Sequence, residues 1–171
     1  MAEQVYNVLF LCTGNSARSV LGECLLTHMG QGRFRGYSAG SHPSGRIFPP
    51  VLNFLEGQGV ETGHLRSKSW DEFATPDAPR MDFVFTVCDS AANEVCPVWP
   101  GQPITAHWGM PDPVARAADE EQARRVVQQV VRMLTNRIRL FTSLPLDSLD
   151  RMSLQNRLEE IGREMDEAAI T

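Results

Sequence analysis

The chain has 171 residues, of which 42% are hydrophobic and 22% are charged, and these proportions are typical of a soluble globular protein of one ordinary domain. Its formal net charge of -5 argues against a nucleic acid or an anionic membrane surface as the main partner, although a small anion needs only local positive potential. Because there is neither a long apolar run nor the basic start of a signal peptide, we expect no membrane span and a cytoplasmic location, where the four cysteines are kept reduced.

The first half of the chain alternates between apolar β-rich runs and helical periodicity. Residues 5–11 predict a buried strand that ends at a cysteine, and the apolar spacing over residues 17–29 predicts an amphipathic helix. Residues 34–39 predict a second strand, which a glycine closes. A second helix is expected over residues 49–56, with proline near its start.

The second half continues the same alternation. Residues 82–87 are apolar throughout and predict a central strand, and residues 104–108 predict a fourth strand. The longest predicted helix covers residues 119–142, and a last amphipathic helix is expected over residues 148–168. This order predicts an α/β fold with a four-stranded, mostly parallel sheet and helices on both faces.

We expect one domain over residues 1–145 and a C-terminal helical extension of the same domain over residues 146–171. The last helix is interpreted as packing on the domain, and its alternative role is to form a dimer or to bind a partner. Ligands of such sheets bind beyond the carboxyl ends of the strands. Cys12 and Cys88 each follow a predicted strand directly, so we expect both at this edge.

Residues 12–19, Cys-Thr-Gly-Asn-Ser-Ala-Arg-Ser, join the first strand to the first helix. A loop of this length can curl its backbone N–H groups around one tetrahedral anion, assisted by the helix dipole, and Arg18 can hold two of the anion's oxygens. The same field predicts a depressed pKa for Cys12, and Ser19 is placed to bond its sulfur. The alternative is a buried cysteine before an ordinary polar turn. The predicted oxyanion-binding residues are Thr13, Gly14, Asn15, Ser16, Ala17 and Arg18.

With this loop the chain resembles the low-molecular-weight protein-tyrosine-phosphatase fold, and within it the thiol-dependent arsenate reductases. The resemblance covers about residues 5–143. It implies that Cys12 attacks a tetrahedral oxyanion that Arg18 clamps. Many thioredoxin-linked reductases of this kind carry a second cysteine just before the arginine, where this chain has Ala17, but that cysteine is not part of the redox relay.

A candidate general acid lies in the Gly-Met-Pro-Asp-Pro segment after the fourth predicted strand. The prolines on either side of Asp112 stiffen this turn, so its carboxyl could face the Cys12 loop and protonate a departing oxygen. The resemblance implies this role, and the alternative is an Asp-Pro turn without chemistry. Tyrosine phosphatases place aromatic residues after this pair to line a phosphotyrosine slot. Val114 follows here, which favours a small inorganic substrate.

Two further cysteines, Cys88 and Cys96, lie eight positions apart after the third predicted strand. A helical segment would separate their Cα atoms by roughly 12 Å, whereas a disulfide needs about 5.5–6 Å. We therefore hypothesise a redox switch that rearranges when the two sulfurs join. The alternatives are structural core cysteines or a zinc site, but no Cys-x-x-Cys spacing or suitably spaced histidine supports a metal, and none is expected. Cys24, on the apolar helix face, is interpreted as a small hydrophobe.

The resemblance implies a complete reaction for arsenic detoxification. Cys12 attacks arsenate, Cys88 attacks the Cys12 sulfur to release arsenite, and Cys96 then takes over the disulfide. No cofactor needs to be bound, because an external thiol system, thioredoxin or glutathione with glutaredoxin, supplies the electrons. Phosphate and sulfate are expected to compete with arsenate, and neither a nucleic acid nor a membrane is an expected partner. The choice of reductant and the oligomeric state are left open.

Two other functions are compatible with the same residues. A phosphatase would hydrolyse phosphate esters through a Cys12 phosphoenzyme and leave Cys88 and Cys96 idle. A non-enzymatic redox or oxyanion sensor would be oxidised once per chain without turning over arsenate.

Position 68 differs from related reductases that place a potassium ion beside the loop. Asn15, Glu23 and Ser38 match the asparagine, glutamate and serine of that ion site, but Lys68 occupies the place of its aspartate. The ammonium group could therefore replace the ion and pair with Glu23. The alternative is a solvated surface lysine.

Overall fold

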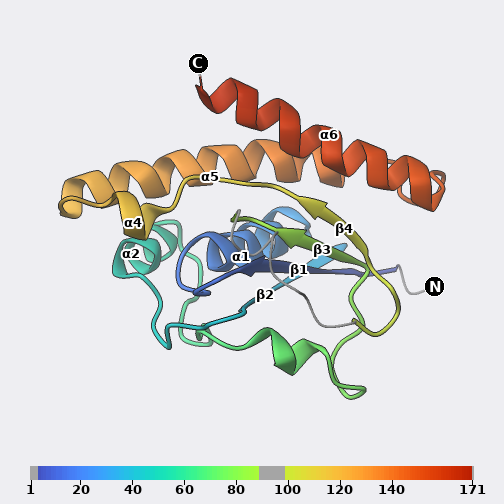
Figure 1. Cartoon of the computed structure of the whole chain (residues 1–171), viewed down its shortest axis with the longest axis horizontal. Coiled ribbons are helices and arrows are strands. Elements are labelled where there is room, and N and C mark those ends of the chain that lie inside the picture. Colours follow the sequence, from blue (N-terminus) through green and yellow to red (C-terminus); the bar gives the residue numbers. More distant parts are fainter. Residues whose placement is uncertain (1–3, 89–98, 171) are drawn as a thin grey trace.

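The computed structural model describes the backbone of residues 4–88 and 99–170, and the side chains of this part up to residue 163. In the described part, four parallel strands form one sheet in the order β2-β1-β3-β4 (Figure 1). The strands are β1 (Tyr6–Cys12), β2 (Phe34–Gly40), β3 (Phe83–Thr86) and β4 (Ile104–His107). The predicted α/β fold with a parallel sheet is confirmed.

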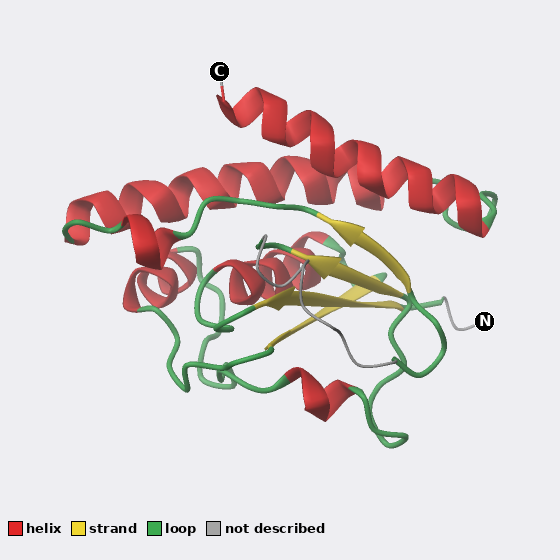
Figure 2. Ribbon diagram, in the orientation of Figure 1, coloured by secondary structure: helices red, strands yellow, loops and turns green. Residues whose placement is uncertain are grey.

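The long helices lie on one side of the sheet, and a short 3-10 helix lies on the other (Figure 2). Strand β1 is buried on both faces, since Val8, Leu9, Phe10 and Leu11 have no exposed surface. The helices are α1 (Arg18–Met29), α2 (Pro49–Gly57), α4 (Pro113–Arg116), α5 (Glu120–Thr142) and α6 (Arg151–Ile170), and the 3-10 helix is η1 (Trp70–Phe73).

An aromatic cluster forms the middle of the larger core, between the sheet and α5. The Trp108 ring stacks on Phe85 with ring centroids 4.0 Å apart, and Phe141 of α5 meets both rings edge-on. The smaller core on the opposite face joins strand residues to Phe73 of η1 and to Trp99. The sheet is therefore fixed from both sides, which holds the carboxyl ends of β1 and β3 in place.

Helix α6 covers the edge strand β4. Arg151 and Gln155 donate from α6 to the backbone carbonyls of Pro103 and Thr105, which no neighbouring strand pairs in the described part. Leu154, Leu158 and Ile161 of α6 enter the larger core. The interpretation of the tail as a helix packed on the domain agrees with these contacts, while the boundary at residue 145 stays a prediction.

The short elements α4 and η1 were missed by the sequence patterns because each is four residues long, too short for a helical period. Both begin at a side-chain cap: Asp112 accepts a hydrogen bond from Val114 N, and Ser69 accepts one from Asp71 N. The long helices agree with their predicted ranges to within a few residues.

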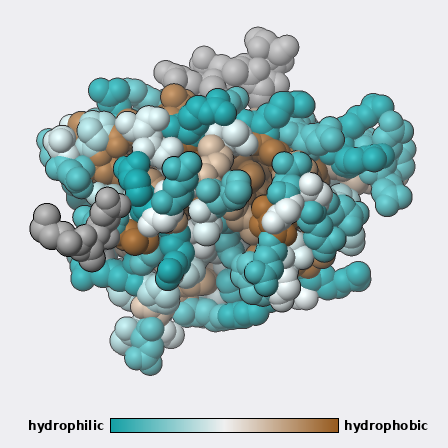
Figure 3. Space-filling view, turned by 180° about the vertical axis from the view of Figure 1, so that it is seen from behind, coloured by the Kyte–Doolittle hydropathy of each residue, from teal (hydrophilic) through white to brown (hydrophobic). Residues whose placement is uncertain are grey.

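The surface turned away from the view of Figure 1 is mainly hydrophilic, with apolar side chains interspersed among polar ones (Figure 3). Such scattered apolar residues are ordinary for a folded domain. Among the described residues, no helix combines the length and the apolar character that crossing a membrane would require.

Candidate active site

The carboxyl ends of the two central strands bring Cys12 and Cys88 to the same edge of the sheet, as the sequence predicted. Both side chains are 3% exposed. Cys88 lies at the rim of the Cys12 loop, since its sulfur is 3.7 Å from Thr13 Oγ1. A second thiol therefore lies beside the loop of the first, while the position of Cys96 lies outside the described residues.

The Cys12 loop curls because its carbonyl oxygens are bonded on the outside. They accept hydrogen bonds from the backbone of the segment before α2: Thr13 O from His42 N at 2.9 Å, Gly14 O from Ser44 N at 2.9 Å and Ser16 O from Phe48 N at 2.8 Å. In a trans peptide the N–H points opposite to the carbonyl, so the N–H groups that follow these carbonyls turn inward. Asn15 N–H shows this directly, since it lies 3.2 Å from Cys12 Sγ.

Asn15 is the central brace of the loop. Its side chain has no exposed surface and its φ is +45°, a left-handed conformation that asparagine tolerates. Its amide donates to Ser19 Oγ at 2.8 Å and its carbonyl oxygen accepts from Lys68 N at 2.9 Å. Ser19 Oγ lies 2.9 Å from Cys12 Sγ, a hydrogen bond in which either atom can be the donor.

The predicted depression of the Cys12 pKa is wrong in its net direction. Burial raises the pKa of this thiol above its ordinary value, because the thiolate would lose its hydration. Hydrogen bonds from Ser19 and the charge of Arg18 lower the pKa, but they do not outweigh burial. The charge of an ionised Cys88 acts in the same direction as burial.

Arg18 bridges the loop to the predicted general acid. Its Nη1 donates to the carbonyl of Met110 at 3.1 Å, and its Nη2 lies 3.4 Å from a carboxylate oxygen of Asp112. The Asp112 side chain is 38% exposed, compared with 14% for Arg18. Its other oxygen accepts from Val114 N at 3.0 Å, which fixes the carboxylate at the start of α4. The structure therefore brings Asp112 to the mouth of the Cys12 loop.

The Lys68 ammonium lies beside Glu23 and Ser38, two of the three other predicted members of the cation site. Its ammonium is 3.7 Å from Glu23 Oε1 and 3.5 Å from Ser38 Oγ, and Ser38 donates to Glu23 at 2.6 Å. Burial lowers the Lys68 pKa, while the charge of Glu23 raises it. The predicted pairing of Lys68 with Glu23 is confirmed, and the surface-lysine alternative is wrong. Within residues 4–88 and 99–163, no cluster of histidine, cysteine and carboxylate side chains is suited to a metal ion.

Cys24 has no part in this site. Its side chain is 6% exposed on α1, and burial raises its pKa to about 12. Its predicted role as a small buried hydrophobe agrees with both observations.

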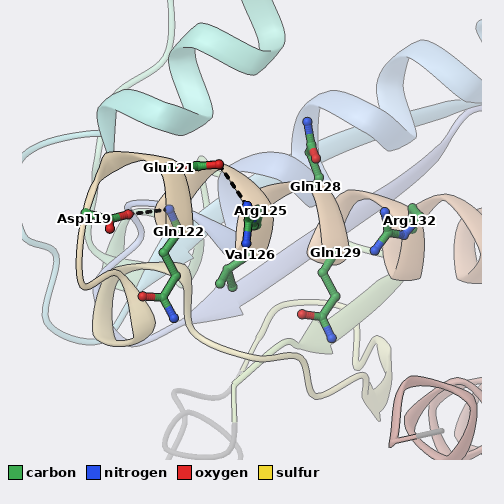
Figure 4. A pocket seen from close by; sticks show the side chains of 8 residues that line it. All are labelled: Asp119, Glu121, Gln122, Arg125, Val126, Gln128, Gln129 and Arg132. Carbon is green, nitrogen blue, oxygen red and sulfur yellow. Dashed lines mark hydrogen bonds and ion pairs between the residues drawn. The ribbon is translucent and has the colours of Figure 1, made fainter.

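A cavity of about 530 Å³ lies along α5, and the Cys12 loop contributes no residue to its lining. Figure 4 shows polar and charged side chains of the helix around it, with Asp119 and Glu121 bonded to Gln122 and Arg125. None of the residues that line it is a predicted site residue. We therefore assign the chemistry to the Cys12 loop.

Several residues that shape the site have no signal in the sequence. The segment 42–48 braces the loop through backbone atoms alone, so no side-chain motif marks it. Arg137 of α5 is fully buried and donates to the carbonyl of Gly109, close to Asp112. A charged residue on a long helix is normally expected in solvent, and its spacing alone does not reveal this contact.

Comparison with known proteins places this arrangement in a family. Residues 7–150 match the family described as low molecular weight phosphotyrosine protein phosphatase. The arsenate reductases of Bacillus subtilis and Shouchella clausii are each 31% identical over 134 residues, which cover 78% of this chain and 93% of theirs.

Solved structures of arsenate reductases resemble this chain as well. The thioredoxin-dependent arsenate reductase of Corynebacterium glutamicum superposes with a TM-score of 0.62 at 30% identity, covering 86% of this chain and 66% of that protein. An arsenate reductase in a phosphate-binding state superposes with a TM-score of 0.60 at 26% identity, covering 79% of this chain and 98% of that one.

Proposed function

The chain belongs to the low molecular weight phosphotyrosine protein phosphatase family, and we propose that within this family it is an arsenate reductase. The observation that carries the proposal is the second buried thiol at the loop, with Cys88 Sγ 3.7 Å from Thr13 Oγ1. Hydrolysis of a phosphate ester needs one nucleophilic cysteine, whereas reduction of an oxyanion needs a second thiol to take the oxidation further. The relatives named arsenate reductase support the same conclusion.

In the first step, arsenate binds in the loop to inward N–H groups and Arg18. The arriving arsenate dianion is the base that takes the Cys12 proton. The Cys12 sulfur then forms a bond to arsenic as one As–OH bond breaks. Asp112 gives that hydroxide a proton, so that water leaves and a thioarsenate ester remains on Cys12.

In the second step, Cys88 attacks the Cys12 sulfur as a thiolate, and the proton that it has given up ends on the departing arsenite. A sulfur–sulfur bond forms, and the electron pair of the sulfur–arsenic bond leaves with arsenic, which is reduced from As(V) to As(III) and departs as arsenite. The two thiols are oxidised to a Cys12–Cys88 disulfide, which balances the two electrons. Cys96 then attacks Cys88 and releases Cys12 as a thiolate.

An external thiol system returns the Cys88–Cys96 disulfide to two thiols. We propose thioredoxin as the first reductant to test, because a structural relative is described as thioredoxin-dependent. Glutathione with glutaredoxin is the second. The relay requires a compartment in which thiols are kept reduced, as in the cytoplasm, and phosphate and sulfate should compete for the loop.

The phosphatase alternative is weaker because no aromatic residue directly follows the Asp112-Pro pair. Val114, 46% exposed, stands directly after the Asp112-Pro pair where an aryl slot would need flat side chains. A small inorganic oxyanion needs no such slot.

The test is turnover with arsenate in the presence of excess reductant, measured as arsenite released by wild type, Cys88→Ser and Cys96→Ser. The reductase predicts many arsenites per wild-type chain and loss of turnover in both variants. Hydrolysis of an activated aryl phosphate by the same samples is the matched control, because it needs Cys12 alone. Full arsenite turnover without either cysteine would contradict the proposal, as would a wild type that releases none.

A further inference from the structure

A buried arginine joins the segment before Asp112 to the C-terminal helix. Arg137 of α5 has no exposed surface, and its Nη1 donates to Gly109 O at 3.0 Å while its Nη2 donates to Gly162 O of α6 at 3.1 Å. Burying a guanidinium costs free energy even when it is hydrogen-bonded. An apolar side chain of similar volume in its place often leaves the fold equally stable or more stable. We therefore look for its role in the two backbone carbonyls that it holds, those of Gly109 and Gly162.

Helix α6 approaches the same segment so closely that it needs a glycine. A Cβ on Gly162 would lie 2.4 Å from His107 O, so any larger residue would push the helix away. Trp108 Nε1 donates to Leu158 O of α6 at 3.0 Å, one helical turn earlier. Helix α6 therefore packs against His107 and Trp108, at the point where β4 leads into the segment before Asp112. The family match ends at residue 150, and α6 begins at Arg151.

The opposite side of this segment depends on a residue that must serve the substrate. Arg18 donates to Met110 O, the carbonyl next to that of Gly109, and pairs with Asp112. When an oxyanion occupies the Arg18 fork, these contacts weaken, because one guanidinium has a limited number of donors. Pro111 and Pro113 have no N–H with which the segment could brace itself. Arg137 lies outside the loop, so its bond to Gly109 O does not compete with a bound oxyanion.

We propose that Arg137 and α6 form a clamp that holds Asp112 at the mouth of the Cys12 loop. Arg137 is a positioning residue, which acts through the Gly109 carbonyl and touches neither the substrate nor the reacting sulfur. The inference rests on the proposed function, because it assumes that Asp112 is the general acid. It assigns to the helix beyond the family match a role in the reaction.

The decisive test is a double-mutant cycle between Arg137→Met and Asp112→Asn. In the wild-type background, Arg137→Met should lower kcat for arsenate by about 10–100-fold, the cost of misplacing a reacting group by roughly 1 Å. KM should change less than about threefold, since the Cys12 loop is untouched. In the Asp112→Asn background the same substitution should cost almost nothing further.

Arg132→Met, an exposed position on the same helix, is the matched control and should leave kcat unchanged. A loss from Arg137→Met of equal factor in both backgrounds would overturn the clamp, because a general loss of structure does not depend on Asp112.

Gly162→Ala tests the same clamp by displacing α6, and it replaces the first variant if Arg137→Met does not fold. It should show the same kcat loss that disappears with Asp112→Asn, while Arg163→Ala, its exposed neighbour, should be silent. Hydrogen exchange of residues 107–116 tests the clamp independently of the proposal that the protein reduces arsenate. Faster exchange there in Arg137→Met, with unchanged exchange in residues 12–19, supports the clamp even if wild type makes no arsenite. Unchanged exchange at 107–116 in both variants would overturn it.

Discussion

Two segments meet at the candidate site, and they are held in different ways. The Cys12 loop is fixed from outside through its backbone, since the segment 42–48 donates to its carbonyl oxygens, and from inside by the fully buried side chains of Asn15 and Ser19. The segment 109–112 is held at Asp112 by the cap of α4, where Val114 N donates to the carboxylate, and at Gly109 and Met110 by the side chains of Arg137 and Arg18. The nucleophile loop therefore has a polar brace of its own, whereas the backbone before the acid depends on two arginine side chains.

The Cys12 loop and the segment 109–112 should respond differently to substitution. A substitution inside the Cys12 loop should affect both anion binding and the nucleophile. A remote substitution near the segment 109–112 should affect proton transfer alone.

The largest expected effect is at the nucleophile. Cys12→Ser should lower arsenite release by at least about 10⁴-fold, because the sulfur forms the covalent intermediate. Calorimetric titration with sulfate is the control and should show binding within a few-fold of wild type, since the inward N–H groups and Arg18 remain. Residual turnover above a few per cent would show that another thiol attacks arsenate.

The next effect is at the acid. Asp112→Asn should lower kcat for arsenate by about 10²–10³-fold with little change in KM, because a general acid acts in the transition state. Steady-state kcat and KM for arsenate of the variant and the wild type provide the measurement. If KM rose tenfold at unchanged kcat, Asp112 would be a binding residue and the contrast between the two segments would fail.

A smaller effect is expected at the brace of the Cys12 loop. Asn15→Ala removes the bonds to Ser19 and Lys68 N and forces a left-handed φ on alanine, so it should cost about 2–4 kcal/mol of unfolding free energy. Asn15→Gly restores the φ preference and should recover about 1 kcal/mol of this loss. Urea unfolding of the three proteins measures both. Equal stability of the alanine and glycine variants would show that the left-handed φ of residue 15 does not contribute to the loss.

Raising the pH should weaken the fold through Cys12. In the unfolded chain this thiol loses its proton near its ordinary pKa of 9.0, while burial raises the pKa in the folded protein. The unfolding free energy should therefore fall as pH rises through 9, by at most about 1.4 kcal/mol per pH unit. Cys12→Ser should flatten this fall, while Cys24, also buried, contributes equally to both proteins. A wild-type curve no steeper than that of the variant would mean that the thiol ionises in the fold.

The smallest expected effect is that of potassium. Because the Lys68 ammonium stands beside Glu23 and Ser38, potassium and sodium at equal ionic strength should give the same activity and Tm. Lys68→Ala is the comparison, since it vacates the cation position. A potassium-specific gain in wild type would show that the ammonium does not replace an ion.

The contrast between the segments also explains what the sequence could predict. The Cys12 loop was predictable because its residues are contiguous and lie between a strand and a helix. Asp112 was predicted because the resemblance assigns the general acid to an Asp-Pro pair in this region of the chain. Arg137 was not found, because its partners Gly109 and Gly162 are distant in sequence and contribute backbone carbonyls.

The pKa of Cys12 was predicted in the wrong direction for a related reason. Charges near the sulfur can be read from the motif, but its burial depends on how the whole sheet packs, which no local pattern records. The proposed switch between Cys88 and Cys96 stays a prediction, because residues 89–98 lie outside the described part.

The central claim is that reduction of arsenate leaves its oxidation on Cys12 and Cys88. The direct measurement is a single turnover of Cys96→Ser with arsenate and no external reductant, followed by counting arsenite and mapping disulfides by mass spectrometry. The account predicts about one arsenite per chain and a Cys12–Cys88 disulfide, because the relay stops there. Arsenite without that disulfide, or a fully reduced chain that hydrolyses aryl phosphate, would contradict it.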